Sequence, residues 1–142
     1  MTAKQVFALT GLLALTAGNS AFADDFSARL GRVPVDSRTQ SSIAGIGHAS
    51  AELNGQRLAI AGDFEGMLGA ATSANLHLSP AVGVRGPVIY PLQIETDASG
   101  RLSGNVTLKA DEVAALRAGR LYIQIASESA PEGNLWGWLL EQ

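Results

Sequence analysis

The sequence predicts an all-β domain, a sandwich or a barrel of antiparallel strands, with one short helix. Three observations lead to this prediction. Several short segments alternate apolar and polar residues with a period of two, Gly-rich turn sequences separate them, and a single segment has helical spacing. Short strands joined by such turns are typical of sandwiches and barrels, and the residues alone leave both open.

The first 23 residues are predicted to be a secretory signal peptide. Lys4 precedes an apolar run at residues 6–17, which is too short to span a bilayer, and Ala21-Phe22-Ala23 has the small-x-small pattern of a cleavage site. Cleavage after Ala23 would leave 142 − 23 = 119 residues. We therefore expect residues 24–142 to form a single domain in the periplasm or outside the cell.

Composition excludes several classes of function. The chain has no Cys, so disulfides, thiolate metal sites and a Cys nucleophile are excluded. Its net charge is −3 and its Lys and Arg residues are scattered, which argues against a nucleic-acid partner. No run after the signal segment approaches the roughly 20 apolar residues of a membrane helix, so we expect no membrane span.

Residues 45–64 predict the first hairpin. Asn54-Gly55 is the dipeptide favoured in a two-residue type I′ turn, in which both positions need a positive φ. A turn there would place Ala51 opposite Leu58, so that apolar side chains face each other across the pair. Turn chemistry and alternation thus agree on a hairpin.

A second hairpin is predicted from residues 92–96 and 102–108. Both segments alternate, and Asp97-Ala98-Ser99-Gly100 between them is a turn sequence. Residues 24–39 show little periodicity, so their pattern is compatible with either a strand or a loose arm.

One helix and one further strand follow. Val113 and Leu116 stand three residues apart in a segment that ends at Gly119, so we expect a helix over residues 111–118 with a glycine at its end. Alternation returns in residues 121–125, which predicts a strand.

The end of the chain predicts a strand with two apolar faces. Trp136 and Trp138 project to one side, while Leu135, Gly137 and Leu139 project to the other. Such a strand is either buried on both sides or presents an aromatic surface, which could form a ligand groove or a dimer contact.

The order of several short motifs resembles the CHRD domain. These domains typically contain a strand ending in Gly-Leu, a small-His-x-His segment, a Gly-Pro strand, a short helix ending in Leu-x-x-Gly, a Tyr-x-Asn-x-His-Thr strand and a closing Gly-x-Ile-Arg-Gly. The similar segments here are residues 58–67, 74–77, 86–89, 116–119, 121–123 and 131–137. The resemblance implies an extracytoplasmic antiparallel Greek-key β-sandwich, immunoglobulin-like or similar to Cu,Zn superoxide dismutase.

The chain departs from the family pattern at its polar positions. The family's first two His residues match Asn75 and His77, the third matches Ala126, and the closing Arg matches Trp136. One remaining imidazole does not make a copper site, since catalytic metals usually need three protein ligands. We therefore expect no metal site and no cofactor, and hypothesise that an aromatic cluster replaces a polar one.

Function is predicted from this cluster, because no catalytic motif is present. The sequence lacks a Gly-x-Ser-x-Gly elbow, a His-Glu-x-x-His pair, a P-loop and a dinucleotide fingerprint. We expect a noncatalytic binding module for a partner protein or a small apolar ligand, with a homodimer as a further prediction. The ligand-binding residues would be Asn75, His77, Tyr122, Trp136 and Trp138.

An alternative reading makes the chain a small periplasmic enzyme or metal-handling protein. It would use His77 together with Asn75, Glu128 or Tyr122. A carboxylate within hydrogen-bond reach of His77 would favour this reading, whereas an open surface lined by tryptophan would favour the binding module.

Overall fold

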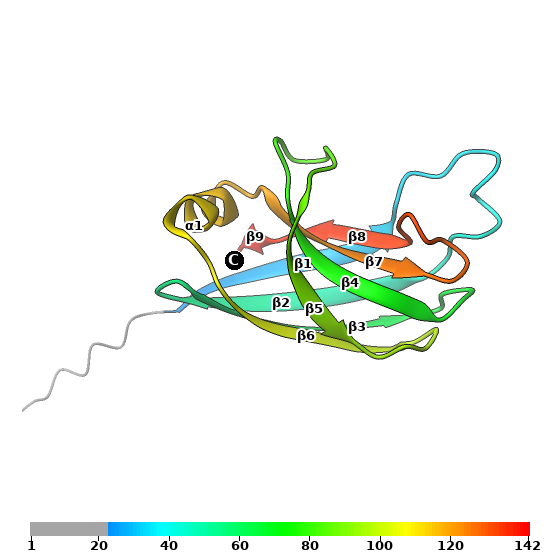
Figure 1. The fold of residues 1–142 in the computed structure, drawn as a ribbon, viewed down its shortest axis with the longest axis horizontal. Helices are drawn as coiled ribbons and strands as arrows, with labels where there is room; N and C mark the ends of the chain where they lie inside the picture. The colour runs from blue at the N-terminus through cyan, green and yellow to red at the C-terminus, as the bar shows by residue number, and fades with distance from the viewer. Residues whose placement is uncertain (1–22) are drawn as a thin grey trace, which may run out of the picture.

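The computed structural model describes residues 23–142 as an antiparallel β structure with one helix (Figure 1). The predicted signal peptide lies outside the described residues, apart from Ala23. Within residues 23–142, no helix is both long and apolar enough to span a bilayer. The elements are β1 (Asp24–Arg32), β2 (Ile46–Asn54), β3 (Arg57–Glu65), β4 (Ala71–Leu78), β5 (Val88–Ile94), β6 (Gly100–Thr107), α1 (Ala110–Arg117), β7 (Leu121–Ser127), β8 (Leu135–Trp138) and β9 (Leu140–Glu141).

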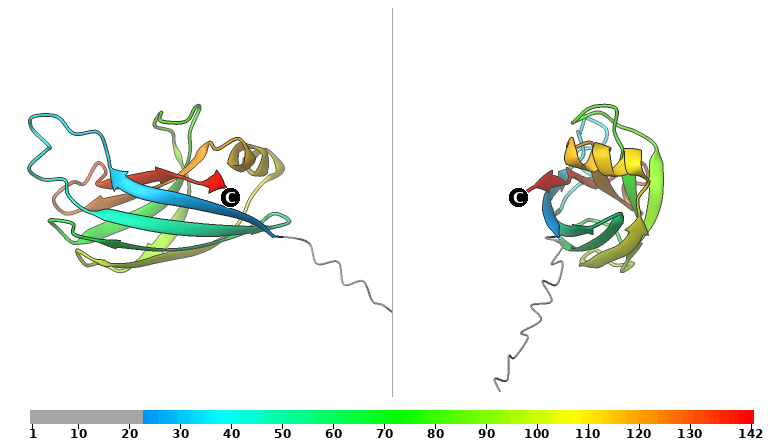
Figure 2. Two further views of the ribbon diagram at one scale, coloured as in Figure 1. Left: turned by 180° about the vertical axis from the view of Figure 1, so that it is seen from behind. Right: turned by 90° about the vertical axis from the view of Figure 1, so that its left-hand side faces the viewer.

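The strands form a closed barrel rather than the predicted sandwich of two separate sheets. Eight strands follow one another in the order β2-β3-β6-β5-β4-β7-β8-β1, and β1 also pairs with β2, which closes the ring. The short β9 adds to β1 beyond β8. Seen from one end, the strands surround a common interior, with α1 at one side (Figure 2).

Two strands close the barrel because each passes from one sheet to the other. Strand β1 pairs with β2 up to Leu30, and with β8 through Gly31 and Arg32. Strand β5 pairs with β4 up to Leu92 and with β6 from Gln93 onward. The sandwich prediction is therefore corrected: the two sheets are continuous at both edges, which pairs backbone groups that would otherwise be exposed.

The Greek-key connection implied by the family resemblance is present. Strands β4, β5 and β6 follow one another as neighbours, and β7 then returns through α1 to pair with β4. This gives the spatial order β7-β4-β5-β6, which is the Greek-key arrangement.

The inward faces of the strands form one hydrophobic core. Alternate residues along β1, β2, β3 and β7 are buried, as period-two alternation requires. The largest fully buried apolar side chains of this core are Phe26, Leu30, Leu58, Leu76, Leu102, Leu108, Leu116, Leu121, Ile123, Ile125 and Leu135.

The first predicted hairpin is confirmed, but its register differs. Asn54 pairs with Arg57, so the turn contains Gly55 and Gln56 instead of Asn54 and Gly55. Gly55 has φ +67° and no described non-glycine residue has a positive φ, so the type I′ turn, which needs two such residues, is wrong. Ala51 consequently lies opposite Ile60 rather than Leu58. The pairing moves by two residues, so each side chain keeps its predicted face.

The second hairpin and the helix are confirmed. Strands β5 and β6 pair around the predicted turn, and α1 ends just before Gly119, whose φ is +72°. The hydroxyl of Tyr90 on β5 donates a hydrogen bond to the buried carboxylate of Glu112 on α1 at 2.8 Å. This bond raises the pKa of Tyr90 and attaches the helix to the barrel.

Both ends of the described chain are strands. Residues 24–32, which the pattern left undecided, form β1, and the final strand is β8. Leu135 and Gly137 of β8 and Leu139 directly after it are buried on the inner side, while Trp136 and Trp138 are partly exposed on the outer side. The two predicted faces are therefore present.

Gly137 is expected to be required where β8 approaches β1. A Cβ at Gly137 would collide with the carbonyl oxygen of Arg29, whereas a Cβ at Gly31 on the facing strand would meet nothing within 4 Å. We predict that Gly137→Ala lowers the free energy of unfolding by about 1–3 kcal/mol, as overpacking typically does. Gly31→Ala is the matched control and should stay within about 0.5 kcal/mol of the unmutated protein. Urea unfolding of both variants measures the difference, and equal losses would contradict the role of close packing.

Candidate functional site

The predicted ligand-binding residues meet on the outer face of β4, β7 and β8. Tyr122 on β7 lies directly between His77 on β4 and Trp138 on β8. In the next row, Gln124 lies between Asn75 and Trp136. Directly opposite residues of antiparallel strands project to the same side, so all five predicted residues share one face. The sequence prediction thus selected a contiguous group, although its function is a separate question.

Four rings of this face form an aromatic cluster, which we define as His77, Tyr122, Trp136 and Trp138. The imidazole stacks on Tyr122 with ring centroids 4.6 Å apart, and Tyr122 lies 4.7 Å from Trp138. Trp136 meets Trp138 edge to face at 4.8 Å. Such arrangements stabilise aromatic pairs by about 0.5–1.5 kcal/mol beyond burial, so the rings support one another.

His77 is buried and held in one orientation. Its side chain is 7% exposed, and its Nδ1 lies 2.9 Å from the carbonyl oxygen of Gly86. A carbonyl only accepts hydrogen bonds, so Nδ1 carries the proton of this bond. Nε2 is itself buried without a hydrogen-bond partner. His77 therefore acts as a fixed member of the cluster.

The loop of residues 79–87, between β4 and β5, covers this part of the cluster. The amide of Gly86 donates to the hydroxyl of Tyr122 at 3.0 Å, and that hydroxyl lies 3.1 Å from the carbonyl oxygen of Gly86. A Cβ at Gly86 would collide with the carbonyl oxygen of Leu78, so the loop passes too close for any other residue. The loop is thereby fixed to the barrel wall.

Arg85 in the same loop reaches the second row. Its Nη1 donates to Oε1 of Gln124 at 3.0 Å, and its guanidinium carbon lies 5.1 Å from the ring centroid of Trp136. Sequence reasoning did not select Arg85, Gly86 or Gln124. The sequence did offer a signal for Arg85, because residues 66–94 contain no Asp, Glu, Lys or other Arg.

A shallow pocket of about 410 Å³ opens beside the two tryptophans. Val82 and Leu140, which are 60% and 52% exposed, contribute apolar side chains to it. Nε1 of Trp138 is buried close by without a hydrogen-bond partner. The lining residues are Arg29, Gly31, Val82, Trp136, Gly137, Trp138 and Leu140.

Of the residues named for the enzyme or metal reading, Tyr122 and Asn75 lie on the same face as His77, whereas Glu128 does not. Glu128 follows the far end of β7, six residues beyond Tyr122, which corresponds to roughly 20 Å along a strand. Using Glu128 together with His77 is therefore wrong. In residues 23–142, no group of three or more His, Cys, Asp or Glu side chains could hold a metal ion.

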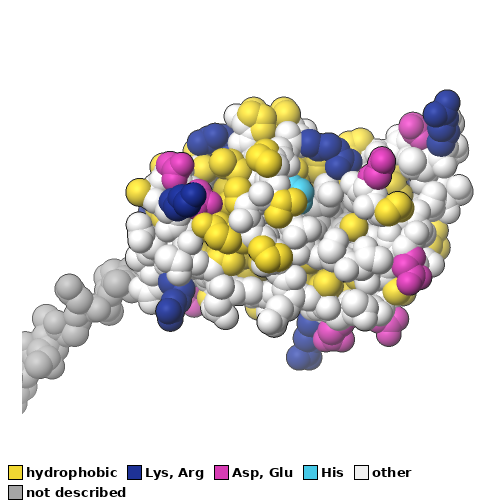
Figure 3. Space-filling model, viewed as in Figure 1, with side chains coloured by type: hydrophobic (Ala, Val, Ile, Leu, Met, Phe, Trp, Pro, Cys, Tyr) yellow, Lys and Arg dark blue, Asp and Glu magenta, His cyan; other side chains and the backbone are white. Residues whose placement is uncertain are grey.

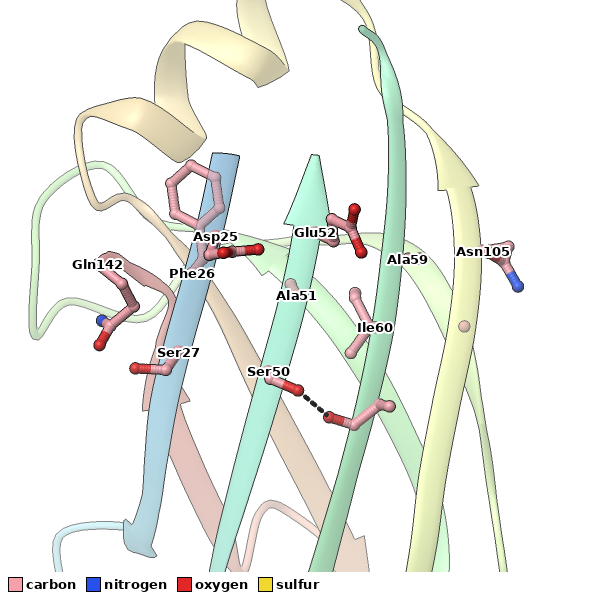
Figure 4. A pocket seen from close by; sticks show the side chains of 12 residues that line it. Asp25, Phe26, Ser27, Ser50, Ala51, Glu52, Ala59, Ile60, Asn105 and Gln142 are labelled. Atoms are coloured by element: carbon pink, nitrogen blue, oxygen red, sulfur yellow. Dashed lines mark hydrogen bonds between the residues drawn. The ribbon is translucent and has the colours of Figure 1, made fainter. Parts of the chain in front are cut away.

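A second depression, of about 380 Å³, lies on the outer face of β1, β2, β3 and β6 (Figure 4). Asp25 and Glu52 lie there on directly opposite positions of β1 and β2, and several of the other lining residues are Ser, Ala or Gly. The hydroxyl of Ser50 lies 3.5 Å from the carbonyl oxygen of Ala61. Phe26 is the aromatic residue that lines this depression, and it is buried in the core, whereas Trp136 and Trp138 are partly exposed. The pocket beside Trp136 is therefore the better candidate site.

The hydroxyl of Tyr122 is expected to hold the covering loop in place. In Tyr122→Phe, the amide of Gly86 loses its partner, and we predict hydrogen exchange at this amide about tenfold faster, as the loss of one hydrogen bond implies. Tyr90→Phe is the control, because the hydroxyl of Tyr90 contacts Glu112 and Thr107 instead. Exchange mass spectrometry or NMR measures the rates; an unchanged rate at Gly86 in Tyr122→Phe would contradict this role.

Comparison with known families matches residues 26–139 to the CHRD domain. No curated protein and no solved structure shows significant similarity to the chain. The match spans β1 to Leu139 and thus includes the whole aromatic cluster and its covering loop. The chain therefore belongs to the CHRD domain family.

Proposed function

We propose that the protein is an exported, noncatalytic CHRD binding module that holds an apolar group of its partner in the pocket beside Trp136 and Trp138. The observation that carries the proposal is the pairing of these two indoles with the exposed side chains of Val82 and Leu140 in one pocket. Exposed aromatic and aliphatic groups on a rigid wall are typical of binding sites.

The buried polar atoms of the cluster support a binding role. Nε2 of His77 and Nε1 of Trp138 are both buried without partners, and such groups cost about 1–3 kcal/mol each. Proteins tolerate such local costs chiefly at functional sites. The partner is a protein that offers an apolar side chain, or a small apolar ligand.

The hydrogen bonds of His77 favour binding over catalysis. A general base must reach the proton that it removes, but Nδ1 of His77 faces Gly86 and Nε2 is shielded from solvent. Among the described residues, no carboxylate forms a hydrogen bond with the imidazole.

We also propose that residues 1–23 direct the export of a domain that begins at Asp24, to the periplasm or beyond. The charged start, the apolar run and the Ala21-Phe22-Ala23 signal support this assignment. Membership of the CHRD family, which suggests an extracellular binding module, supports it too.

Export is expected to remove the first 23 residues. The intact mass of the protein recovered from the periplasm should correspond to a chain beginning at Asp24. Ala23→Leu should retain the uncleaved form, because the cleavage site needs small residues, whereas Phe22→Leu should be processed normally. Full-length protein recovered from the cytoplasm in all three cases would refute export.

The pocket is expected to bind an apolar fluorescent probe. We predict that 1-anilinonaphthalene-8-sulfonate binds at one site and that Trp136→Ala weakens this binding about 30-fold, the loss that removal of an aromatic anchor of 2 kcal/mol implies. Leu68→Ala is the control, because Leu68 is 61% exposed but lies outside the pocket. Equal probe affinity in all three proteins, measured by fluorescence titration, would refute the pocket.

A further inference from the structure

The loop between β4 and β5 has a fixed apolar turn at its tip. The amide of Val84 donates to the carbonyl of Ala81 at 3.0 Å, which closes a four-residue β-turn. Gly83 occupies its third position with φ +83°, the conformation that a type II turn requires. Val82 and Val84 are 60% and 47% exposed at this tip.

The backbone of the turn is hydrogen-bonded within the loop itself. The hydroxyl of the buried Ser79 lies within hydrogen-bond distance of the carbonyls of Ala81 and Val84, 2.6 Å from the latter. The amide of Ala81 donates to the same hydroxyl at 3.2 Å. The amide and carbonyl groups of both Ala81 and Val84 are thus paired within the loop, which fixes the shape of the turn.

Basic side chains surround the tip. Arg85 follows the turn directly, Arg29 lies across the pocket from Val82, and Arg120 donates to the carbonyl of Ser79 at 3.5 Å. The side chain of Glu132, whose backbone carbonyl accepts a hydrogen bond from Arg85, is exposed. The chain as a whole carries a net charge of −3, so the positive charge around this tip is a local feature.

The tip also projects from the barrel. The ribbon views show the loop standing away from the strands (Figures 1 and 2). In the space-filling view, hydrophobic side chains gather over this loop and the start of β5, with basic side chains on two sides (Figure 3).

We propose that this turn docks the protein on an anionic lipid surface, with Val82 and Val84 entering the acyl region and the arginines contacting headgroups. Lipid hydrocarbon buries a projecting aliphatic tip without requiring a matching cavity in the partner. Arginine complements anionic headgroups. The proposal goes beyond the proposed function, because it concerns the tip of the loop rather than an apolar group held in the pocket.

Vesicle binding of the exported full-chain product tests the proposal. The probes are vesicles of phosphatidylglycerol and phosphatidylethanolamine, and vesicles of phosphatidylcholine alone, compared by flotation at low and high salt. We expect binding to the anionic vesicles only, reduced several-fold by 0.5 M NaCl. Val82→Ser/Val84→Ser should weaken it at least about tenfold, because buried aliphatic groups drive such insertion. Val35→Ser/Leu68→Ser, which changes two exposed apolar residues outside this loop, should bind normally.

Single variants separate this proposal from the pocket. Val84 does not line the pocket, so Val84→Ser should weaken vesicle binding but leave the binding of 1-anilinonaphthalene-8-sulfonate unchanged. Trp136→Ala should show the opposite pattern. Absence of vesicle binding, or binding that persists in Val82→Ser/Val84→Ser, would overturn the lipid proposal and leave the pocket intact. A dimer that this double variant converts to a monomer without vesicles would overturn it too, since the loop would then cover a second copy.

Discussion

Closure of the β-sheet is the constraint on which the rest of this structure depends. In the part of the chain described, the eight strands of the ring have neighbours on both sides because β1 and β5 each change partners along their length. A closed ring offers little free strand edge to an incoming peptide, so recognition by strand addition is disfavoured. Recognition must then use outward side chains and loops, and these are the parts of the molecule that carry its unusual features.

Strands β4, β7 and β8 build the core and the candidate site at the same time. Inward residues such as Leu76 and Ile123 pack in the barrel, while His77, Tyr122 and Trp138 occupy the alternate outward positions. Because both sets of side chains share one hydrogen-bonded backbone, the aromatic cluster inherits the rigidity of the barrel. A rigid aromatic wall loses little conformational entropy on binding, which favours affinity.

The aromatic cluster and the covering loop act as one unit. Tyr122 belongs to the cluster and also binds the backbone of Gly86, so the position of the loop depends on the barrel wall. The same loop places Val82 beside the tryptophans and Arg85 over Trp136. The pocket and the projecting turn are therefore neighbouring surfaces that share Val82, whereas Trp136 belongs only to the pocket and Val84 only to the turn, which is why Val84 and Trp136 can distinguish them.

The sequence by itself determined the strand class, the faces of the strands and the helix, because these depend on local alternation and spacing. It also determined that Asn75, His77, Tyr122, Trp136 and Trp138 belong together, through their order in the family pattern. Local rules could not decide the position of the first turn, since a shift of two residues keeps every side chain on the same face. Only the tertiary structure decided that the barrel closes, that Glu128 lies far from His77, and that Arg85 and Gly86 reach the cluster. Closure and loop packing depend on contacts between residues distant in the sequence, such as Gly86 and Tyr122, and periodicity within one segment does not specify such contacts.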